Sequence, residues 1–199
     1  MPLPRTPVAS IRAASPEREE QNQNFMAILP IIWAPDPRLK VVSTPVETID
    51  ESIHALMADM LATMYDEPGI GLSAIQIGVP KRVVVVDVAR EGEQPRPMRF
   101  VNPEIVWESD TIVAWEEGCL SLPDHYAEVE RPEAVRMRYR DEHGKVQEME
   151  ADGILSRCLQ HELDHLDGVL FVDHLSAVRR SIILRKLAKL KKSKLGESA

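Results

Sequence analysis

The chain has 199 residues, of which 44% are hydrophobic, and this size and composition are typical of one globular domain with a buried core. No apolar stretch reaches the roughly 18 residues of a membrane span, and the N-terminus lacks the pattern of a signal peptide, so we expect a cytoplasmic protein without membrane contacts. The net charge of −8 conceals an asymmetry, because eight basic and no acidic residues lie between Arg179 and Lys194. The rest of the chain is therefore strongly acidic, which argues against DNA binding, whereas the tail is basic.

The chain divides into a leader, a domain and a tail. Residues 1–25 are rich in Pro, Arg, Glu and Gln without an apolar period, which predicts a disordered leader. Residues 26–192 contain all the periodic segments, and we expect them to form a single domain. Residues 193–199 are predicted to be a flexible tail.

A first helix is predicted after an extended, proline-punctuated segment. Thr48 and Glu51 have the spacing of a capping box, and Pro68 with Gly69 ends the pattern. Apolar residues recur between them at helical intervals, which favours core packing as their role: Ile49, Ile53, Met57, Met60 and Met64.

Several short strands are predicted in the middle of the chain. Residues 82–87 contain four consecutive valines, which indicates a strand buried on both faces. Asp141 to Gly144 has the composition of a hairpin turn. The remaining predicted strands are residues 99–101, 111–115, 134–139 and 146–150.

Two further helices complete the prediction. One runs from about Gly153 to Leu166 and ends at Gly168. The other covers about residues 176–191, with Val178, Ile182, Leu187 and Leu190 as its apolar stripe. The expected fold is therefore α+β, with mostly antiparallel sheets surrounding a central helix and with one helix near each end.

The central helix carries His161-Glu162-Leu163-Asp164-His165. Two histidines four residues apart share one face of a helix, so both imidazoles can reach one cation, and Glu162 can then contact a water on that cation. This pattern also occurs by chance on polar helix faces. The other face of this helix is apolar and is expected to pack on the core, which leaves His161, Glu162 and His165 together on the opposite side and favours a metal site. The residues of the apolar face are Leu155, Leu159, Leu163 and Leu166.

A zinc-type catalytic site needs a third protein ligand. His174, the only later histidine, lacks the spacing of the longer peptidase motif, so we look upstream. Cys119 stands in a Gly- and Pro-bounded loop and is the favoured ligand, although a lone cysteine is more often a buried small hydrophobe. Cys158, on the helix itself, is the rival, and we expect it to line the cavity.

Gly69-Ile-Gly-Leu-Ser-Ala-Ile-Gln76 links the first helix to the valine strand. Its glycines are suited to close approach of a substrate backbone, and Gln76 offers an amide donor. A plain helix-to-strand turn explains this segment equally well when it is considered alone.

Taken together, these segments resemble the bacterial peptide deformylases. That family carries Gly-x-Gly-Leu-Ala-x-x-Gln, then Glu-Gly-Cys-Leu-Ser, then Gln-His-Glu-x-Asp-His-Leu, and this chain has all three in the same order between about Met26 and Lys192. One departure is Ser73, where the family usually has Ala, and we expect the change to be tolerated. The leader has no counterpart in the family pattern.

The resemblance implies a metal-dependent hydrolase that removes the formyl group from the starting methionine of nascent polypeptides. It implies one ion per chain, typically Fe²⁺ with Zn²⁺, Ni²⁺ or Co²⁺ as substitutes. The implied site residues fall into four groups: Cys119, His161 and His165 as ligands; Glu162, Gln76 and the Leu120 N–H in catalysis; Ile70, Gly71 and Cys158 against the substrate; and Glu117 with Arg131 as a bracing ion pair.

The basic last helix has two interpretations. A solvated face over an apolar stripe is the ordinary one, whereas related bacterial enzymes use this helix to dock on the ribosome, and its charge suits rRNA phosphates. Two alternative functions stay open beside deformylation. One is a zinc endopeptidase, and the other is a non-catalytic ribosome-associated protein with a structural metal.

Overall fold

The computed structural model describes residues 26–90 and 92–197, so the predicted leader, residues 1–25, lies outside the described residues. The helices are α1 (Glu51–Asp66), α2 (Gly153–Leu166) and α3 (Ala177–Glu197), with 3-10 turns η1 (Pro37–Lys40), η2 (Ala74–Ile77) and η3 (Phe171–His174). The strands are β1 (Gly71–Ser73), β2 (Val83–Val86), β3 (Met98–Glu108), β4 (Ile112–Gly118), β5 (Tyr126–Pro132), β6 (Ala134–Arg140) and β7 (Val146–Asp152).

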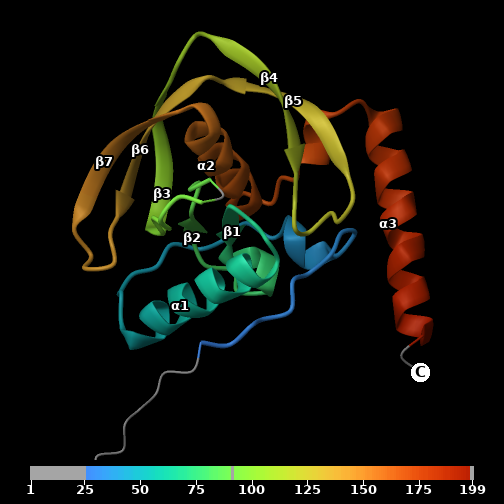
Figure 1. The fold of residues 1–199 in the computed structure, drawn as a ribbon, viewed down its shortest axis with the longest axis horizontal. Helices are drawn as coiled ribbons and strands as arrows, with labels where there is room; N and C mark the ends of the chain where they lie inside the picture. The colour runs from blue at the N-terminus through green and yellow to red at the C-terminus, as the bar shows by residue number, and fades with distance from the viewer. Residues whose placement is uncertain (1–25, 91, 198–199) are drawn as a thin grey trace, which may run out of the picture.

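The strands form two antiparallel sheets around the central helix. The larger sheet has the order β1-β2-β3-β6-β7, and β4 pairs only with β5. Figure 1 shows α2 enclosed between this sheet and the β4–β5 ribbon, with α1 beneath and α3 standing at the side away from the β6–β7 hairpin. The predicted α+β fold with antiparallel sheets around the motif-bearing helix is confirmed.

The valine strand β2 explains why the sheet is covered on both faces. Successive side chains of a strand point to opposite faces. Val83 and Val85 accordingly pack in the cluster formed with α1, whereas Val84 and Val86 pack in the cluster formed with α2. All four are fully buried, as the apolar run predicted. Strand β2 therefore packs against α1 on one face and against α2 on the other.

The N-terminal boundary of α1 differs from the prediction. Asp50, rather than Thr48, caps the helix, and its carboxylate accepts hydrogen bonds from the backbone N–H groups of Ser52 and Ile53. A carboxylate at this position satisfies donors that the first helical turn leaves free. The predicted apolar stripe of α1 is correct, since Ile53 and three of its methionines are buried.

The predicted stripe of α3 is mostly wrong. Val178 is 70% exposed, and Ile182 and Leu190 are also exposed. Leu187 is buried, and Ile183 and Leu184 pack beside it against the cluster that contains Phe171. The helix continues past Lys191 to Glu197, into the segment predicted to be a flexible tail. The helix packs on the rest of the domain along one narrow face, so its opposite face is exposed to solvent. None of the helices in the described part of the chain is long and apolar enough to cross a membrane.

Candidate active site

Three side chains from separate elements converge on one point. The Cys119 sulfur and one ring nitrogen each of His161 and His165 lie within 4.8 Å of one another. Cys119 follows the end of β4, and the two histidines stand one turn apart on α2. The Cys119 sulfur lies 3.1 Å from Nε2 of His165. A thiolate and two imidazoles are a donor set that suits zinc, iron, nickel or cobalt, so these residues fit a metal ion.

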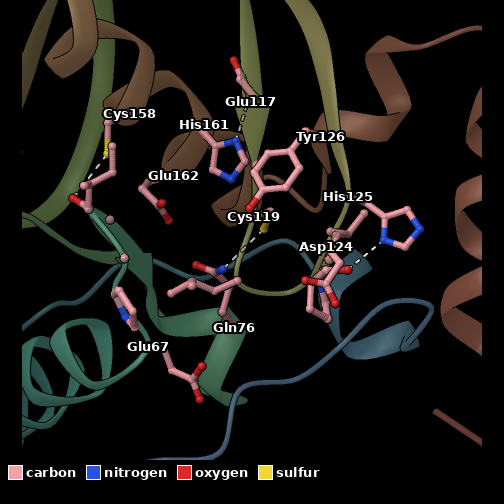
Figure 2. A pocket seen from close by; sticks show the side chains of 18 of the residues that line it. Glu67, Gln76, Glu117, Cys119, Asp124, His125, Tyr126, Cys158, His161 and Glu162 are labelled. Atoms are coloured by element: carbon pink, nitrogen blue, oxygen red, sulfur yellow. Dashed lines mark hydrogen bonds and ion pairs between the residues drawn. The ribbon is translucent and has the colours of Figure 1, made fainter. Parts of the chain in front are cut away.

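A carboxylate behind the site orients one of these imidazoles. Nδ1 of His161 lies 2.9 Å from Oε2 of Glu117, which leaves Nε2 for a metal (Figure 2). Arg131 donates from Nε and Nη2 to the two Glu117 oxygens, at 2.5 and 3.0 Å. Burial raises the pKa of Glu117, but the hydrogen bonds from His161 and Arg131 outweigh burial and lower it to about 2. Glu117 is thus a permanent anion next to His161.

Burial also determines the protonation of His165 and Cys158. Burial lowers the pKa of His165 well below 6.5, so its imidazole is neutral, the form that binds a metal. Burial, together with the nearby Glu162 carboxylate, raises the pKa of Cys158 well above 9, so this residue is a neutral thiol. Its sulfur lies 3.6 Å from the carbonyl oxygen of Ile70 and outside the Cys119 cluster. The structure therefore places Cys158 in the cavity wall.

Glu162 occupies the same pocket with one oxygen unpaired. It is buried, and its Oε2 has no hydrogen-bond partner among the described residues. Burial raises its pKa to about 7, against the lowering effects of His161 and Ser73. A carboxyl group that titrates near neutral pH can both take up and release a proton during a reaction. Figure 2 shows Glu162 beside His161, with its carboxylate directed into the pocket.

Two donors lie on the other side of the cluster. Gln76 is buried, and its Nε2 lies 3.7 Å from the Cys119 sulfur and 3.3 Å from Oγ of Ser121. The backbone N–H of Leu120, directly after Cys119, makes no hydrogen bond to the described residues. Both donors can therefore meet an oxygen that develops negative charge in front of Cys119.

The glycines of the Gly69–Gln76 segment permit close contacts with protein side chains. A Cβ on Gly71 would lie 2.6 Å from Oε1 of Glu162 and 2.7 Å from the Cys158 sulfur. A Cβ on Gly69 would lie 2.8 Å from Cδ1 of Leu120. Strand β1, which begins at Gly71, is also the outermost strand of its sheet, so its free edge can pair with an extended peptide.

These groups line one pocket of about 570 Å³. This volume suits a small ligand or the end of a peptide. Ile70, 41% exposed, stands at the pocket beside the free edge of β1. All the site residues inferred from the sequence therefore line this pocket, with two exceptions. His165 and Arg131 lie behind it, in contact with Cys119 and Glu117 respectively.

The pocket also contains residues that the sequence did not indicate. Tyr126 is paired with Gly118 across the β4–β5 ribbon, and a Cβ on Gly118 would lie 2.5 Å from the Tyr126 ring. The ring is 66% exposed and lines the pocket, as do Trp33 and Arg157. Arg157 lies over the ring of Trp115, with its guanidinium carbon 4.7 Å from the ring centre. No spacing in the sequence distinguishes these residues, and Tyr126 reaches the pocket only through the register of β4 with β5.

Comparisons with known proteins point to one family. A sequence model of the polypeptide deformylase family matches residues 28–181. The peptide deformylase of Rhizobium meliloti (strain 1021) is 56% identical over 169 residues, which cover 85% of this chain and 97% of that protein. The crystal structure of peptide deformylase from Ehrlichia chaffeensis superposes with a TM-score of 0.81 at 38% identity, covering 85% of this chain and 99% of the other. A second structure, of the Ehrlichia chaffeensis enzyme in complex with actinonin, superposes with a TM-score of 0.79 at 40% identity, covering 82% and 98%.

Proposed function

The chain belongs to the polypeptide deformylase family and hydrolyses the N-formyl group of nascent polypeptides. We propose that residues 26–192 form its catalytic domain, with Cys119, His161 and His165 as the metal ligands. The observation that carries the ligand assignment is the convergence of one sulfur and two ring nitrogens within 4.8 Å. We further propose one Fe²⁺ ion per chain, with Zn²⁺, Ni²⁺ or Co²⁺ as functional substitutes, since Cys and His ligands suit all four.

When bound, a divalent cation at these ligands acidifies water and polarises a carbonyl group. Glu162 takes the proton of the attacking water, because its unpaired oxygen faces the pocket and its pKa is near neutral. Gln76 Nε2 and the Leu120 N–H stabilise the oxyanion that forms on the formyl group. Glu162 then gives the proton to the departing amine, which leaves formate and a free methionine N-terminus.

The substrate is held by the edge of β1 and the pocket behind it. The backbone of Ile70 and Gly71 pairs with the first residues of the formylated peptide, and the methionine side chain enters the cavity beside Cys158. The Glu117–Arg131 pair takes no part in proton transfer. It holds His161 in the tautomer that leaves Nε2 free and braces the strand that leads into Cys119.

The decisive experiment measures formate release by the Fe²⁺-loaded enzyme, purified anaerobically, from a short formyl-Met peptide. The same assay is run with the acetyl-Met peptide and with Glu162→Ala. We expect fast turnover that is selective for the formyl group and falls by at least about 100-fold in the variant with its metal retained. Cleavage of internal peptide bonds would instead support an endopeptidase, and a loaded protein without turnover would support a non-catalytic role.

We also propose that the protein acts in the cytoplasm and docks on the ribosome through α3. Five basic side chains of this helix are exposed and make no ion pair with the described residues: Arg179, Arg185, Lys186, Lys189 and Lys192. Such a face suits the phosphates of rRNA. Deletion of the residues after Lys186 is expected to abolish co-sedimentation with ribosomes at low salt while deformylation of a short peptide persists. Unchanged co-sedimentation would exclude this docking mode.

A further inference from the structure

Ser73 stands where the related family usually has Ala, and it makes specific contacts inside the site. It is the last residue of β1 and is fully buried. Its backbone N–H donates to Oε1 of Gln76 at 2.8 Å, and its hydroxyl donates to the same oxygen at 2.9 Å. Two donors from one residue thus converge on a single amide oxygen.

These two hydrogen bonds have different consequences for the Gln76 side chain. The backbone N–H can only donate, so it determines that the oxygen end of the amide faces Ser73. The hydroxyl adds a second bond from another direction and limits rotation of the amide about its last side-chain bond. Because Oε1 is held in this way, Nε2 is turned toward Ser121 and Cys119, where the oxyanion forms.

We propose that Ser73 is a positioning residue for deformylation, whose hydroxyl holds the Gln76 amide in the orientation that stabilises the oxyanion. This inference rests on the proposed role of Gln76 as an oxyanion donor. Preorganisation of that donor matters because a donor that is already aimed needs no reorganisation when the charge develops. Ser73 does not contact the substrate in this scheme and acts only through Gln76.

The hydroxyl also lies near Glu162, and this offers a competing route by which Ser73 affects turnover. A double-mutant cycle separates the two routes, since mutations that act through one group are not additive. The cycle comprises Ser73→Ala, Gln76→Ala and the double variant, each as the full-length chain loaded with Fe²⁺. Metal content is measured alongside kcat and KM for a formyl-Met peptide.

We expect Ser73→Ala to lower kcat about fivefold, which corresponds to about 1 kcal/mol, with KM and metal content unchanged. Gln76→Ala is expected to lower kcat by about 100-fold or more. Adding Ser73→Ala to Gln76→Ala is expected to cause no further loss. A matched control is Ser43→Ala, which removes a buried hydroxyl that has no partner among the described residues and does not line the pocket.

Three results would overturn the proposal. The first is wild-type kcat in Ser73→Ala. The second is an equal fall caused by Ser73→Ala in both backgrounds, which assigns its effect to Glu162. The third is wild-type kcat in Gln76→Ala, which places the failure in the proposed function of Gln76 and not in its contact with Ser73.

A measurement independent of turnover follows the Gln76 side-chain amide by NMR in the Zn²⁺-loaded protein, with its signals assigned by their loss in Gln76→Ala. We expect one sharp pair of amide proton signals in the wild type and in Ser43→Ala. In Ser73→Ala this pair is expected to shift and broaden as the amide gains rotational freedom. Signals that stay at their wild-type positions and widths would contradict the proposal even if the Ser73 variant lost activity.

Discussion

Arg131 and Glu117 form a doubly hydrogen-bonded ion pair in which both side chains are buried. Arg131 comes from β5 and Glu117 from β4, two residues before Cys119. The Glu117 carboxylate also accepts from His161 on α2. One buried ion pair therefore connects the strand that leads into Cys119 to the helix that carries His161 and His165.

Replacement of Arg131 by Met is expected to destabilise the metal-free protein by about 3–5 kcal/mol, because it leaves the Glu117 carboxylate buried without its cation. Urea unfolding of the metal-free form measures this change. The matched control is Arg136→Met, which removes an exposed ion pair with Glu150 and is expected to cost less than about 1 kcal/mol. Equal losses in the two variants would show that the Arg131–Glu117 pair contributes no more than a surface pair.

Asp164, inside the histidine motif, extends this connection to the surface. Its Oδ2 lies 3.0 Å from Nη1 of Arg131 and 2.7 Å from Nε2 of His174. We expect Asp164→Asn to speed the release of Zn²⁺ to a chromogenic chelator about threefold to tenfold, because Asp164 holds Arg131, whose partner Glu117 orients the proposed ligand His161. Asp167→Asn makes the same change on the same helix end, breaks an exposed pair with Arg82, and is expected to leave the rate unchanged. Equal rates in the two variants would disprove the connection.

Gly71→Ala is expected to reduce kcat/KM about 100-fold or more while the protein stays folded and loaded. The added methyl group would lie 2.6 Å from Oε1 of Glu162 and 2.7 Å from the Cys158 sulfur, so the carboxylate proposed as the general base must move. A displacement of about 1 Å at a reacting group costs about that factor. Formate release, metal analysis and the unfolding temperature test this together. Activity within threefold of the wild type would show that Glu162 tolerates displacement.

The fold could be predicted where the apolar residues of a segment pack on a continuous core. The run Val83–Val86 and the helix Gly153–Leu166 match their predicted positions because each packs on a continuous core. Strand β5 (Tyr126–Pro132) was missed, since its outward residues are charged and it ends in proline. The predicted stripe of α3 was wrong because the apolar packing of this helix is limited to Ile183, Leu184 and Leu187, and periodicity cannot indicate how much of a helix is covered.

The site could be predicted from the sequence only in part. The spacing of His161 and His165 predicts one helix face, but nothing local indicates that Cys119 lies 3.1 Å from His165. Loop closure and strand register determine that distance. The same holds for Ser73, whose hydroxyl meets Gln76 only because a tight 3-10 turn follows β1 directly. The resemblance to a family supplied the proposed ligands, whereas the role proposed for Ser73, where the chain departs from the family pattern, required the three-dimensional contacts.

Tyr65 gives a prediction at alkaline pH, away from the metal ligands. Its hydroxyl donates to Oδ2 of Asp87 at 2.6 Å, and burial, followed by that carboxylate, raises the pKa of Tyr65 to about 12. A pKa above the unfolded value of about 10 means that this contribution to stability is complete below pH 10 and disappears as the pH rises to about 12. We therefore expect Tyr65→Phe to be less stable than the wild type at pH 8, by about 0.5–1 kcal/mol for one partly exposed hydrogen bond. The two proteins should converge between pH 10 and 12, as measured by urea unfolding across that range. A stability difference that stays constant to pH 12 would show that the contribution of Tyr65 does not depend on the protonation of its hydroxyl.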